Sequence, residues 1–362
     1  MIQIKRRVRD RESLARTEAA RICLIKPSAL GDVVQALPVL TALRVRFPRA
    51  HIAWVVNSSY AKLLAGHPCL DEIIAFERGP AGPSSAATWR AFRDLCGSLR
   101  QRRFDLVCDI QGLFRSGLMT WATRAPRRVG LADAREGSQW FYTDIVPIVD
   151  GQMSAVDRYW SVAQALGVGE SARQFQIHID VSDQDWAERQ VPVSIAPCVA
   201  IHVGARWMTK RWPTEHFSEI ARRLDREFAA NLVLVGGPED CDAAERIAGV
   251  VSGCCVNLVG KTSLKQLAAV LRRVHLLLSN DSGPMHLAAA LGTPVAALFT
   301  CTSTQRARPY GNGHVLFTTN VWCAASYLKK CSRLECMAEL TPDRVWPVLS
   351  ARVEAIRVQL AA

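Results

Sequence analysis

The sequence predicts an α/β fold made of two Rossmann-like, doubly wound domains. From Arg21 onward, short apolar runs of strand length alternate with amphipathic stretches of helix length, which is the pattern of a parallel sheet covered on both faces. The alternation stops in a polar stretch at 167–197 and then begins again. A chain of 362 residues is also long enough for two domains.

The first domain is expected at 21–166, behind a basic tail at 1–20. Its strands are predicted at 22–26, 51–56, 71–76 and 104–110. Its helices are predicted at 33–47, 58–65, 87–102, 113–123 and 155–166.

The second domain is expected at 198–340, after a linker at 167–197 in which Pro192 and Pro197 interrupt any long element. Its strands are predicted at 198–203, 231–235, 256–259, 275–279 and 294–299, and its helices at 215–228, 242–250, 263–273 and 285–291. The last segment, 341–362, is helix-like; packing back on the first domain is one arrangement open to it. Two facing sheets of this kind predict a ligand cleft between their carboxyl ends.

Composition restricts the class of protein. No stretch approaches the roughly 20 uninterrupted apolar residues of a membrane-spanning helix, and the first twenty residues lack the apolar segment of a secretory signal. The twelve cysteines are scattered through apolar segments, as Cys23, Cys108 and Cys198 are, which is typical of reduced core thiols. We therefore expect a cytoplasmic protein.

The net charge of +12 predicts an anionic partner, which would be nucleic acid, an anionic membrane surface or a phosphorylated substrate. Arginines gather around 100–103 and 124–128. Individual residues in such runs are equally explained as solvated helix faces. Because no zinc-finger spacing or RNA-recognition signature accompanies the charge, we do not expect a nucleic-acid-binding protein.

The segment 22–32 runs from a strand through a tight turn at Gly31 to Asp32, which opens a long helix. An aspartate at this position can cap the helix by accepting its first N–H groups. It can also present a carboxylate to a ligand at the edge of the sheet. Spacing alone favours the cap.

Two segments of the second domain are suited to phosphate. After its first strand, Gly204 opens a loop that carries Lys210. A later strand ends in Asn-Asp-Ser-Gly, so the N–H groups of Ser282 and Gly283 would lie at the positive end of a helix, which suits a diphosphate. The alternatives are a surface charge for the lysine and a simple N-cap for Asp281 or Ser282.

Neither a metal nor a dinucleotide is predicted. Two Asp-x-Asp triplets, at 183–185 and 240–242, precede helix-like segments, where capping explains them. The paired glycines at 236–237 lack the G-x-G-x-x-G spacing. Cys323, Cys331 and Cys336 share a short segment but not the C-x-x-C spacing typical of a zinc site.

Three segments, in order along the chain, resemble the motifs of glycosyltransferase family 9, which contains the ADP-heptose:lipopolysaccharide heptosyltransferases. They are 26–33 (KPSALGDV), 209–217 (TKRWPTEHF) and 279–288 (SNDSGPMHLA), and the resemblance covers about 21–346. It implies a GT-B fold with an acceptor-binding first half, a nucleotide-sugar-binding second half and a cleft that closes on the substrates. It also implies inverting catalysis without a metal or other cofactor.

The resemblance assigns roles to single residues. Asp32 would be the general base that takes the proton of the acceptor hydroxyl, and Lys210 would stabilise the leaving diphosphate. The donor site would comprise Gly204, Lys210, Thr262, Ser263, Asp281, Ser282, Gly283 and His286. The acceptor site would comprise Ser28, Gly31 and Arg115.

The partners implied are ADP-heptose and an anionic lipopolysaccharide core acceptor at the inner face of the inner membrane. The basic residues at 5–9 would help peripheral attachment or belong to a solvated tail. Three alternatives stay open. They are transfer of another nucleotide sugar by the same family, a nucleotide-sugar epimerase or hydrolase on the same fold, and a non-catalytic sugar- or nucleotide-binding protein.

Overall fold

The computed structural model describes residues 11–77, 86–191 and 193–361. The chain divides into two compact units, Met1–His178 and Ile179–Ala362, and each is described by itself. The first ten residues of the predicted basic tail lie outside the described residues, and they include the basic residues at 5–9.

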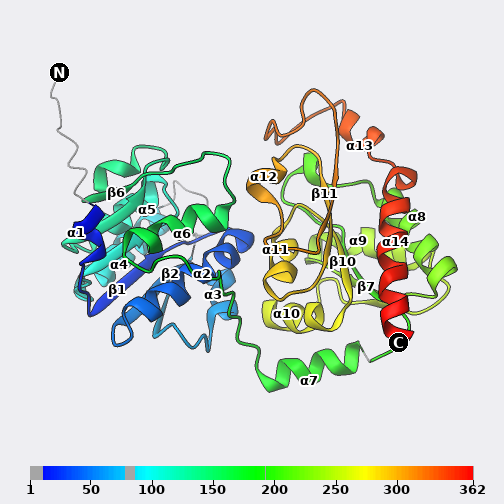
Figure 1. Ribbon diagram of the computed structural model, residues 1–362, viewed down its shortest axis with the longest axis horizontal. Coiled ribbons are helices and arrows are strands. Elements are labelled where there is room, and N and C mark those ends of the chain that lie inside the picture. Colours follow the sequence, from blue (N-terminus) through cyan, green and yellow to red (C-terminus); the bar gives the residue numbers. More distant parts are fainter. Residues whose placement is uncertain (1–10, 78–85, 192, 362) are drawn as a thin grey trace. The chain divides into compact units, whose positions relative to one another are not determined.

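The first unit is built on a six-stranded parallel sheet in the order β3-β2-β1-β4-β5-β6 (Figure 1). Its strands are β1 (Arg21–Ile25), β2 (His51–Asn57), β3 (Glu72–Phe76), β4 (Leu106–Asp109), β5 (Arg127–Leu131) and β6 (Asp144–Val146). The helices are α1 (Arg11–Ala15), α2 (Leu30–Arg46), α3 (Ser58–Leu64), α4 (Ala86–Gln101), α5 (Phe114–Ala122) and α6 (Ala155–Ala165), with a 3-10 turn η1 (Ser138–Phe141).

The core of the first unit forms because its central strands are almost wholly apolar. In register, Ile22 of β1 lies opposite Ile52 of β2 and Leu106 of β4. Cys23 and Leu99 belong to a buried cluster between this sheet and helices α4 and α5. The two helices α2 and α6 pack against one another.

The second unit repeats this plan, with six parallel strands in the order β12-β11-β10-β7-β8-β9. The strands are β7 (Cys198–His202), β8 (Asn231–Val235), β9 (Cys255–Asn257), β10 (Leu276–Asn280), β11 (Val295–Phe299) and β12 (Val315–Thr318). The helices are α7 (Val181–Gln190), α8 (Thr214–Phe228), α9 (Cys241–Ala248), α10 (Leu264–Arg273), α11 (Gly283–Ala290), α12 (Thr304–Ala307), α13 (Glu335–Glu339) and α14 (Pro342–Ala361), with 3-10 turns η2 (Met208–Lys210) and η3 (Pro238–Asp240).

Each predicted strand and helix is present, within a few residues of its expected bounds. Three strands that periodicity did not predict complete the sheets: β5, β6 and β12. β5 begins with two arginines and β6 has three residues, so neither has an apolar run. Arg127 of β5 is instead paired with the buried Asp144 of β6, at 2.8 Å.

Two segments differ from the prediction. The supposed linker at 167–197 contains α7, which packs against α10 of the second unit, where Lys265 Nζ lies 2.6 Å from Asp180 Oδ2. The C-terminal helix α14, for which the first domain was one possible partner, packs against α8 within the second unit. Its buried residues Val345, Leu349 and Val353 belong to the core of that unit. The periodicity of the sequence did not predict this packing.

The three cysteines expected in the core lie there, whereas Cys254 is exposed. Cys23, Cys108 and Cys198 are buried, and every cysteine is a free thiol. Burial raises the pKa of the Cys108 thiol to about 12, as it does that of Cys198. Among the described residues, no helix combines the length and apolarity needed to cross a bilayer.

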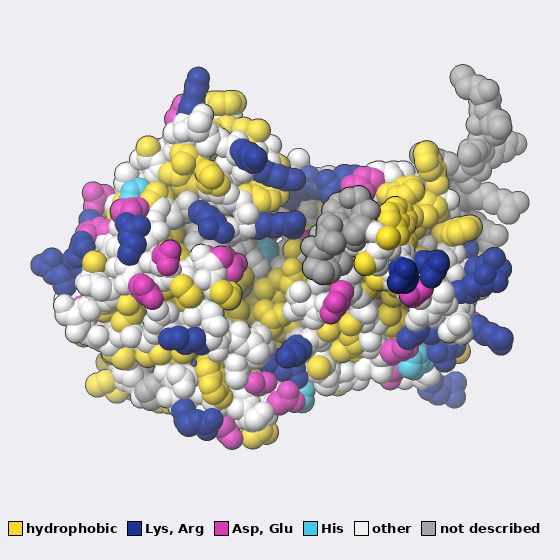
Figure 2. All heavy atoms as spheres, turned by 180° about the vertical axis from the view of Figure 1, so that it is seen from behind, with side chains coloured by type: hydrophobic (Ala, Val, Ile, Leu, Met, Phe, Trp, Pro, Cys, Tyr) yellow, Lys and Arg dark blue, Asp and Glu magenta, His cyan; other side chains and the backbone are white. Residues whose placement is uncertain are grey.

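Positive side chains are spread over the face of the molecule that Figure 2 shows. On the face shown in Figure 2, Lys and Arg side chains are scattered widely, with fewer Asp and Glu between them. The charge thus acts as a broad field attracting anions.

Candidate active site

Three of the predicted site residues follow strands beside the point where the strand order of their sheet reverses. In the first unit β1 has β2 on one side and β4 on the other, and in the second unit β7 has β8 on one side and β10 on the other. Asp32 follows β1, Lys210 follows β7 and Asp281 follows β10. Ligands of doubly wound sheets bind at such switch points, outside the carboxyl ends of the strands.

Asp32 does cap its helix. It is the third residue of α2, and its Oδ2 accepts the backbone N–H of Ala29 at 3.1 Å. A capping bond is therefore present as expected, but Asp32 makes it from inside the helix to the N-cap residue Ala29. It accounts for one of the two carboxylate oxygens.

The other oxygen of Asp32 has one partner from a distant part of the chain, Tyr159, and one close in sequence, Lys26. Its Oδ1 accepts the hydroxyl of Tyr159, from α6, at 2.7 Å, and the ammonium of Lys26 lies 3.4 Å from it. Burial raises the pKa of Tyr159 well above its ordinary value, so this hydroxyl stays a donor. Burial also lowers the pKa of Lys26, which the Asp32 charge opposes. The Asp32 side chain remains 40 % exposed, so capping leaves the carboxylate within reach of solvent.

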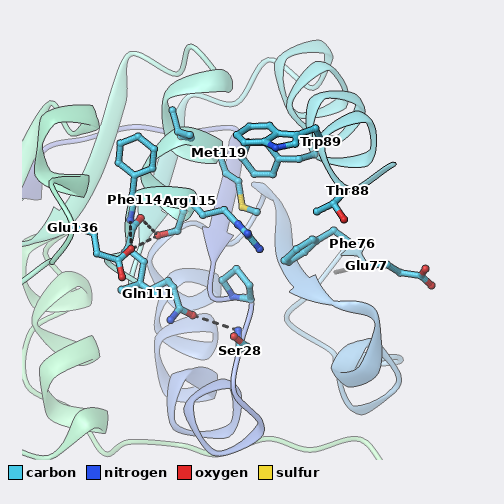
Figure 3. Close-up of a pocket in the computed structure, with 15 residues that line it drawn as sticks. Ser28, Phe76, Glu77, Thr88, Trp89, Gln111, Phe114, Arg115, Met119 and Glu136 are labelled. Atoms are coloured by element: carbon cyan, nitrogen blue, oxygen red, sulfur yellow. Dashed lines mark hydrogen bonds between the residues drawn. The ribbon is translucent and has the colours of Figure 1, made fainter. Parts of the chain in front are cut away.

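Ser28 and Arg115, two of the three predicted acceptor residues, line one pocket of about 590 Å³ in the first unit. Phe76, Trp89 and Phe114 stand around it, and the Arg115 side chain extends across it toward Phe76 (Figure 3). Within the part of the chain that the structure describes, the Arg115 guanidinium makes no hydrogen bond or ion pair.

The loops after β1 and β4, beside this pocket, are held by Gln111, Asp109 and Tyr142, which the sequence did not indicate as site residues. The backbone N–H of Ser28 donates to Gln111 Oε1 at 3.3 Å, which joins the loops after β1 and β4. Buried Asp109, at the end of β4, accepts the N–H groups of Gln111 and Gly112 at 2.9 and 3.1 Å and the hydroxyl of Tyr142 at 2.8 Å. The third predicted acceptor residue, Gly31, is buried in the first turn of α2 and does not line the pocket.

Lys210 and Asp281 form the centre of the site in the second unit. Lys210 Nζ lies 2.6 Å from Asp281 Oδ2, and the Asp281 side chain is 5 % exposed. Thr302, after β11, donates its hydroxyl to the same oxygen at 2.6 Å. The lysine is therefore held by a buried carboxylate and is no free surface charge.

The N-terminus of α11 follows Asp281 directly in the sequence. Ser282 is the N-cap residue of α11, but its side chain makes no capping bond. Its hydroxyl lies 3.3 Å from His202 Nδ1 and 3.1 Å from Ser279 Oγ. Burial lowers the pKa of His202 to about 4, so its ring is neutral near pH 7. Neither Ser282 nor Asp281 is a simple cap, and the N–H of Gly283 stands at the positive end of the helix.

One other predicted donor residue, Ser263, has a structural task. Ser263 caps α10: its hydroxyl accepts the N–H of Gln266 at 3.1 Å, and Gln266 Oε1 accepts the N–H of Ser263 at 2.9 Å. Thr262, half-buried, precedes it after β9. His286 is buried within α11.

A side chain at Gly204 would clash with the carboxylate of Asp240, for which the sequence predicted only a capping role. A Cβ on Gly204 would lie 2.8 Å from Asp240 Oδ1 and closer still to Oδ2. Asp240 is 5 % exposed and accepts the N–H of Gly237 at 3.1 Å, so it does cap η3. Burial raises the pKa of this carboxyl.

Among residues 11–77, 86–191 and 193–361, no group of three or more Cys, His, Asp or Glu side chains is arranged to hold a metal ion. Cys323, Cys331 and Cys336 line one small cavity together with Cys301. Asp183 lies in the first turn of α7, whose N-cap residue is Asp180, so the capping role expected of the triplet at 183–185 is wrong.

The chain is similar to known proteins both in sequence and in fold. It is 27 % identical to the lipopolysaccharide core heptosyltransferase OpsX of Haemophilus influenzae over 82 % of this chain and 84 % of that protein. Its fold matches the glycosyl transferase family 9 structure from Veillonella parvula, with a TM-score of 0.79 at 22 % identity, over 93 % and 97 % of the two chains. It also matches the E. coli heptosyltransferase WaaC with ADP, with a TM-score of 0.73 at 24 % identity, over 92 % and 99 %.

These matches agree with the GT-B fold implied by the sequence motifs. The model of glycosyltransferase family 9 (heptosyltransferase) matches residues 92–337, which is more than half of the chain. The matched region includes the loop of Lys210 and the segment from Asp281 to His286. The chain belongs to glycosyltransferase family 9, the heptosyltransferase family, and is a glycosyltransferase.

Proposed function

We propose that this chain transfers a heptose from ADP-heptose to an acceptor in the lipopolysaccharide inner core, with inversion at the anomeric carbon and without a metal. The named relative is a lipopolysaccharide core heptosyltransferase, and a structural neighbour binds ADP. The observation that carries the mechanism is the Asp32 carboxylate, which stays 40 % exposed while it caps α2.

In the proposed step, Asp32 is the general base. The acceptor hydroxyl oxygen attacks the anomeric carbon and its proton passes to the Asp32 carboxylate. The bond between that carbon and the diphosphate oxygen breaks, and its electron pair leaves with ADP. Tyr159 and Lys26 hold the carboxylate through Oδ1, so its orientation is fixed before substrate arrives.

Lys210 and the tip of α11 would stabilise the departing charge. An ammonium has three N–H donors, and Asp281 accepts from Lys210, so donors remain for phosphate oxygens. The N–H of Gly283 and the dipole of α11 add a second source of positive potential. We place the rest of the donor at Gly204, Thr262, Ser263, Ser282 and His286, which follow β7, β9 and β10 along one edge of the sheet.

The pocket of the first unit would take the acceptor. Arg115 supplies a guanidinium suited to a carboxylate or phosphate, and the aromatic side chains around it offer apolar faces to sugar rings. Ser28 lines the same pocket, and Gly31 shapes the turn that leads to Asp32.

We also propose peripheral contact with an anionic leaflet, supported by the net charge of +12. Sedimentation with vesicles tests it: binding should need anionic lipid and should fall as salt rises. Equal binding to neutral vesicles would contradict it.

The transfer is tested with purified protein, ADP-heptose and a heptose-free inner-core acceptor, with UDP- and GDP-sugars as controls. We expect transfer from ADP-heptose alone, an inverted anomeric configuration in the product by NMR, and an unchanged rate in EDTA. Transfer from another nucleotide sugar would indicate a different donor. Isomerisation or hydrolysis of the donor without acceptor would favour the epimerase or hydrolase, and ligand binding with no turnover would favour the non-catalytic binding protein.

A further inference from the structure

The charge at the proposed donor site is incomplete for the leaving group that it would bind. Lys210 Nζ lies 2.6 Å from Asp281 Oδ2, and Asp281 is almost fully buried, so the ammonium and the carboxylate cancel one another. Thr302 bonds to the same oxygen and holds the carboxylate in place. A nucleoside diphosphate carries more than one negative charge, so a site that works without a metal needs a further cation.

A second lysine, Lys329, is held near Lys210. A hydrogen bond joins the residues that directly precede these two lysines, Thr209 and Leu328. Thr209 Oγ1 donates to the backbone oxygen of Leu328 at 2.6 Å. The residue before Lys210 is therefore bonded to the residue before Lys329, although the two are far apart in sequence. This bond brings the exposed loop after β12 to the turn η2 that carries Lys210.

Further backbone contacts fix the course of that loop. Tyr327 N donates to the backbone oxygen of Cys301 at 2.7 Å, and Thr300 Oγ1 donates to the backbone oxygen of Thr209 at 2.5 Å. Ala325 and Tyr327 both have φ near +59°, a conformation that residues with a side chain rarely adopt. Such a conformation persists where surrounding contacts impose it, so the position of the next residues is set by the fold.

Both ammonium groups lie against one aromatic ring. Lys210 Nζ is 4.7 Å from the centroid of Trp207, and Lys329 Nζ is 5.4 Å from it. Lys329 makes no ion pair with any residue that the structure describes. Two like charges beside one ring repel each other, and an anion that bonds to both would relieve the repulsion.

We propose that Lys329 is a second diphosphate-binding cation of the donor site, an inference that rests on the proposed function. As the bond from the anomeric carbon to the diphosphate oxygen breaks, the electron pair moves onto that oxygen. Lys210, positioned by Asp281, and Lys329, positioned by the loop, then donate to phosphate oxygens. Together the two lysines offset the negative charge of the diphosphate, which Lys210 alone cannot offset because it is paired with Asp281.

The test compares Lys329→Ala with Lys329→Arg and with Lys330→Ala as a matched control. Lys330 is the next residue, equally exposed, and has the same charge. Calorimetry measures the affinity of each protein for ADP and for adenosine, and steady-state kinetics measures kcat/KM for ADP-heptose. We expect Lys329→Ala to weaken ADP binding about tenfold and to lower kcat/KM at least as much, with adenosine binding unchanged. Lys329→Arg should restore most of both, and Lys330→Ala should change neither.

Unchanged ADP affinity in Lys329→Ala, or an equal loss in Lys330→Ala, would overturn the inference and leave the proposed function standing. A selective loss of ADP affinity in a protein that transfers no heptose would contradict the proposed function and retain Lys329 as a diphosphate ligand. Thermal unfolding of each unliganded variant establishes that the fold is intact.

Discussion

Gly204 shows how one missing side chain shapes the donor side of the site. The space beside its Cα is filled by the buried carboxylate of Asp240, which also holds the N–H of Gly237. A methyl group would press on both carboxylate oxygens. We predict that Gly204→Ala lowers the free energy of unfolding by about 1–3 kcal/mol, measured by chemical denaturation.

Gly97→Ala is the matched control, because a Cβ at Gly97 in α4 would meet nothing within 4 Å. It should be neutral or raise the free energy of unfolding by about 0.4–1 kcal/mol, since alanine restricts the unfolded chain. A Gly204→Ala protein as stable as Gly97→Ala would show that the Asp240 carboxylate can move away.

The sequence singled out candidate site residues but few of the groups that hold them. Asp32, Lys210 and Asp281 belong to short motifs that can be recognised along the chain. Tyr159, which holds Asp32, is 127 positions away from it, and no local pattern signals that contact. The same is true of Thr302 and of Lys329, whose roles arise only when distant loops meet.

Among the elements, α14 depends on its packing against α8. Leu349 is fully buried in the core of the second unit, whereas the preceding Val348 is 50 % exposed. We predict that Leu349→Ala lowers the free energy of unfolding by about 2–5 kcal/mol, through lost burial and the cavity left behind. Val348→Ala should change it by less than about 0.5 kcal/mol. Similar small effects at both positions would mean that α14 contributes little to the core.

Strands were predictable where burial makes most of their residues apolar. β7 and β10 are buried at every residue, so their runs stand out. β5 begins with two half-buried arginines and β6 is too short for a pattern, and both are held by neighbouring strands. α7 is a polar helix with one buried residue, Ala187, so its sequence resembles a linker.

At the scale of the whole molecule, each unit contributes one half of the proposed chemistry. The first supplies a carboxylate at the switch point of its sheet, and the second supplies a lysine held by a buried aspartate at the corresponding point. Equivalent placement in two similar sheets explains why the residues that carry the chemistry follow strands in both units. The transfer requires that both groups act on one sugar.

Asp32→Asn tests this claim most directly, because an asparagine oxygen can still accept the Ala29 N–H and keep the cap of α2. We predict that transfer from ADP-heptose falls by about a hundredfold or more, as expected when a general base is lost, while thermal stability and ADP affinity stay at wild-type values. A variant that keeps wild-type turnover would contradict the account, since Asp32 would then be a cap and nothing more.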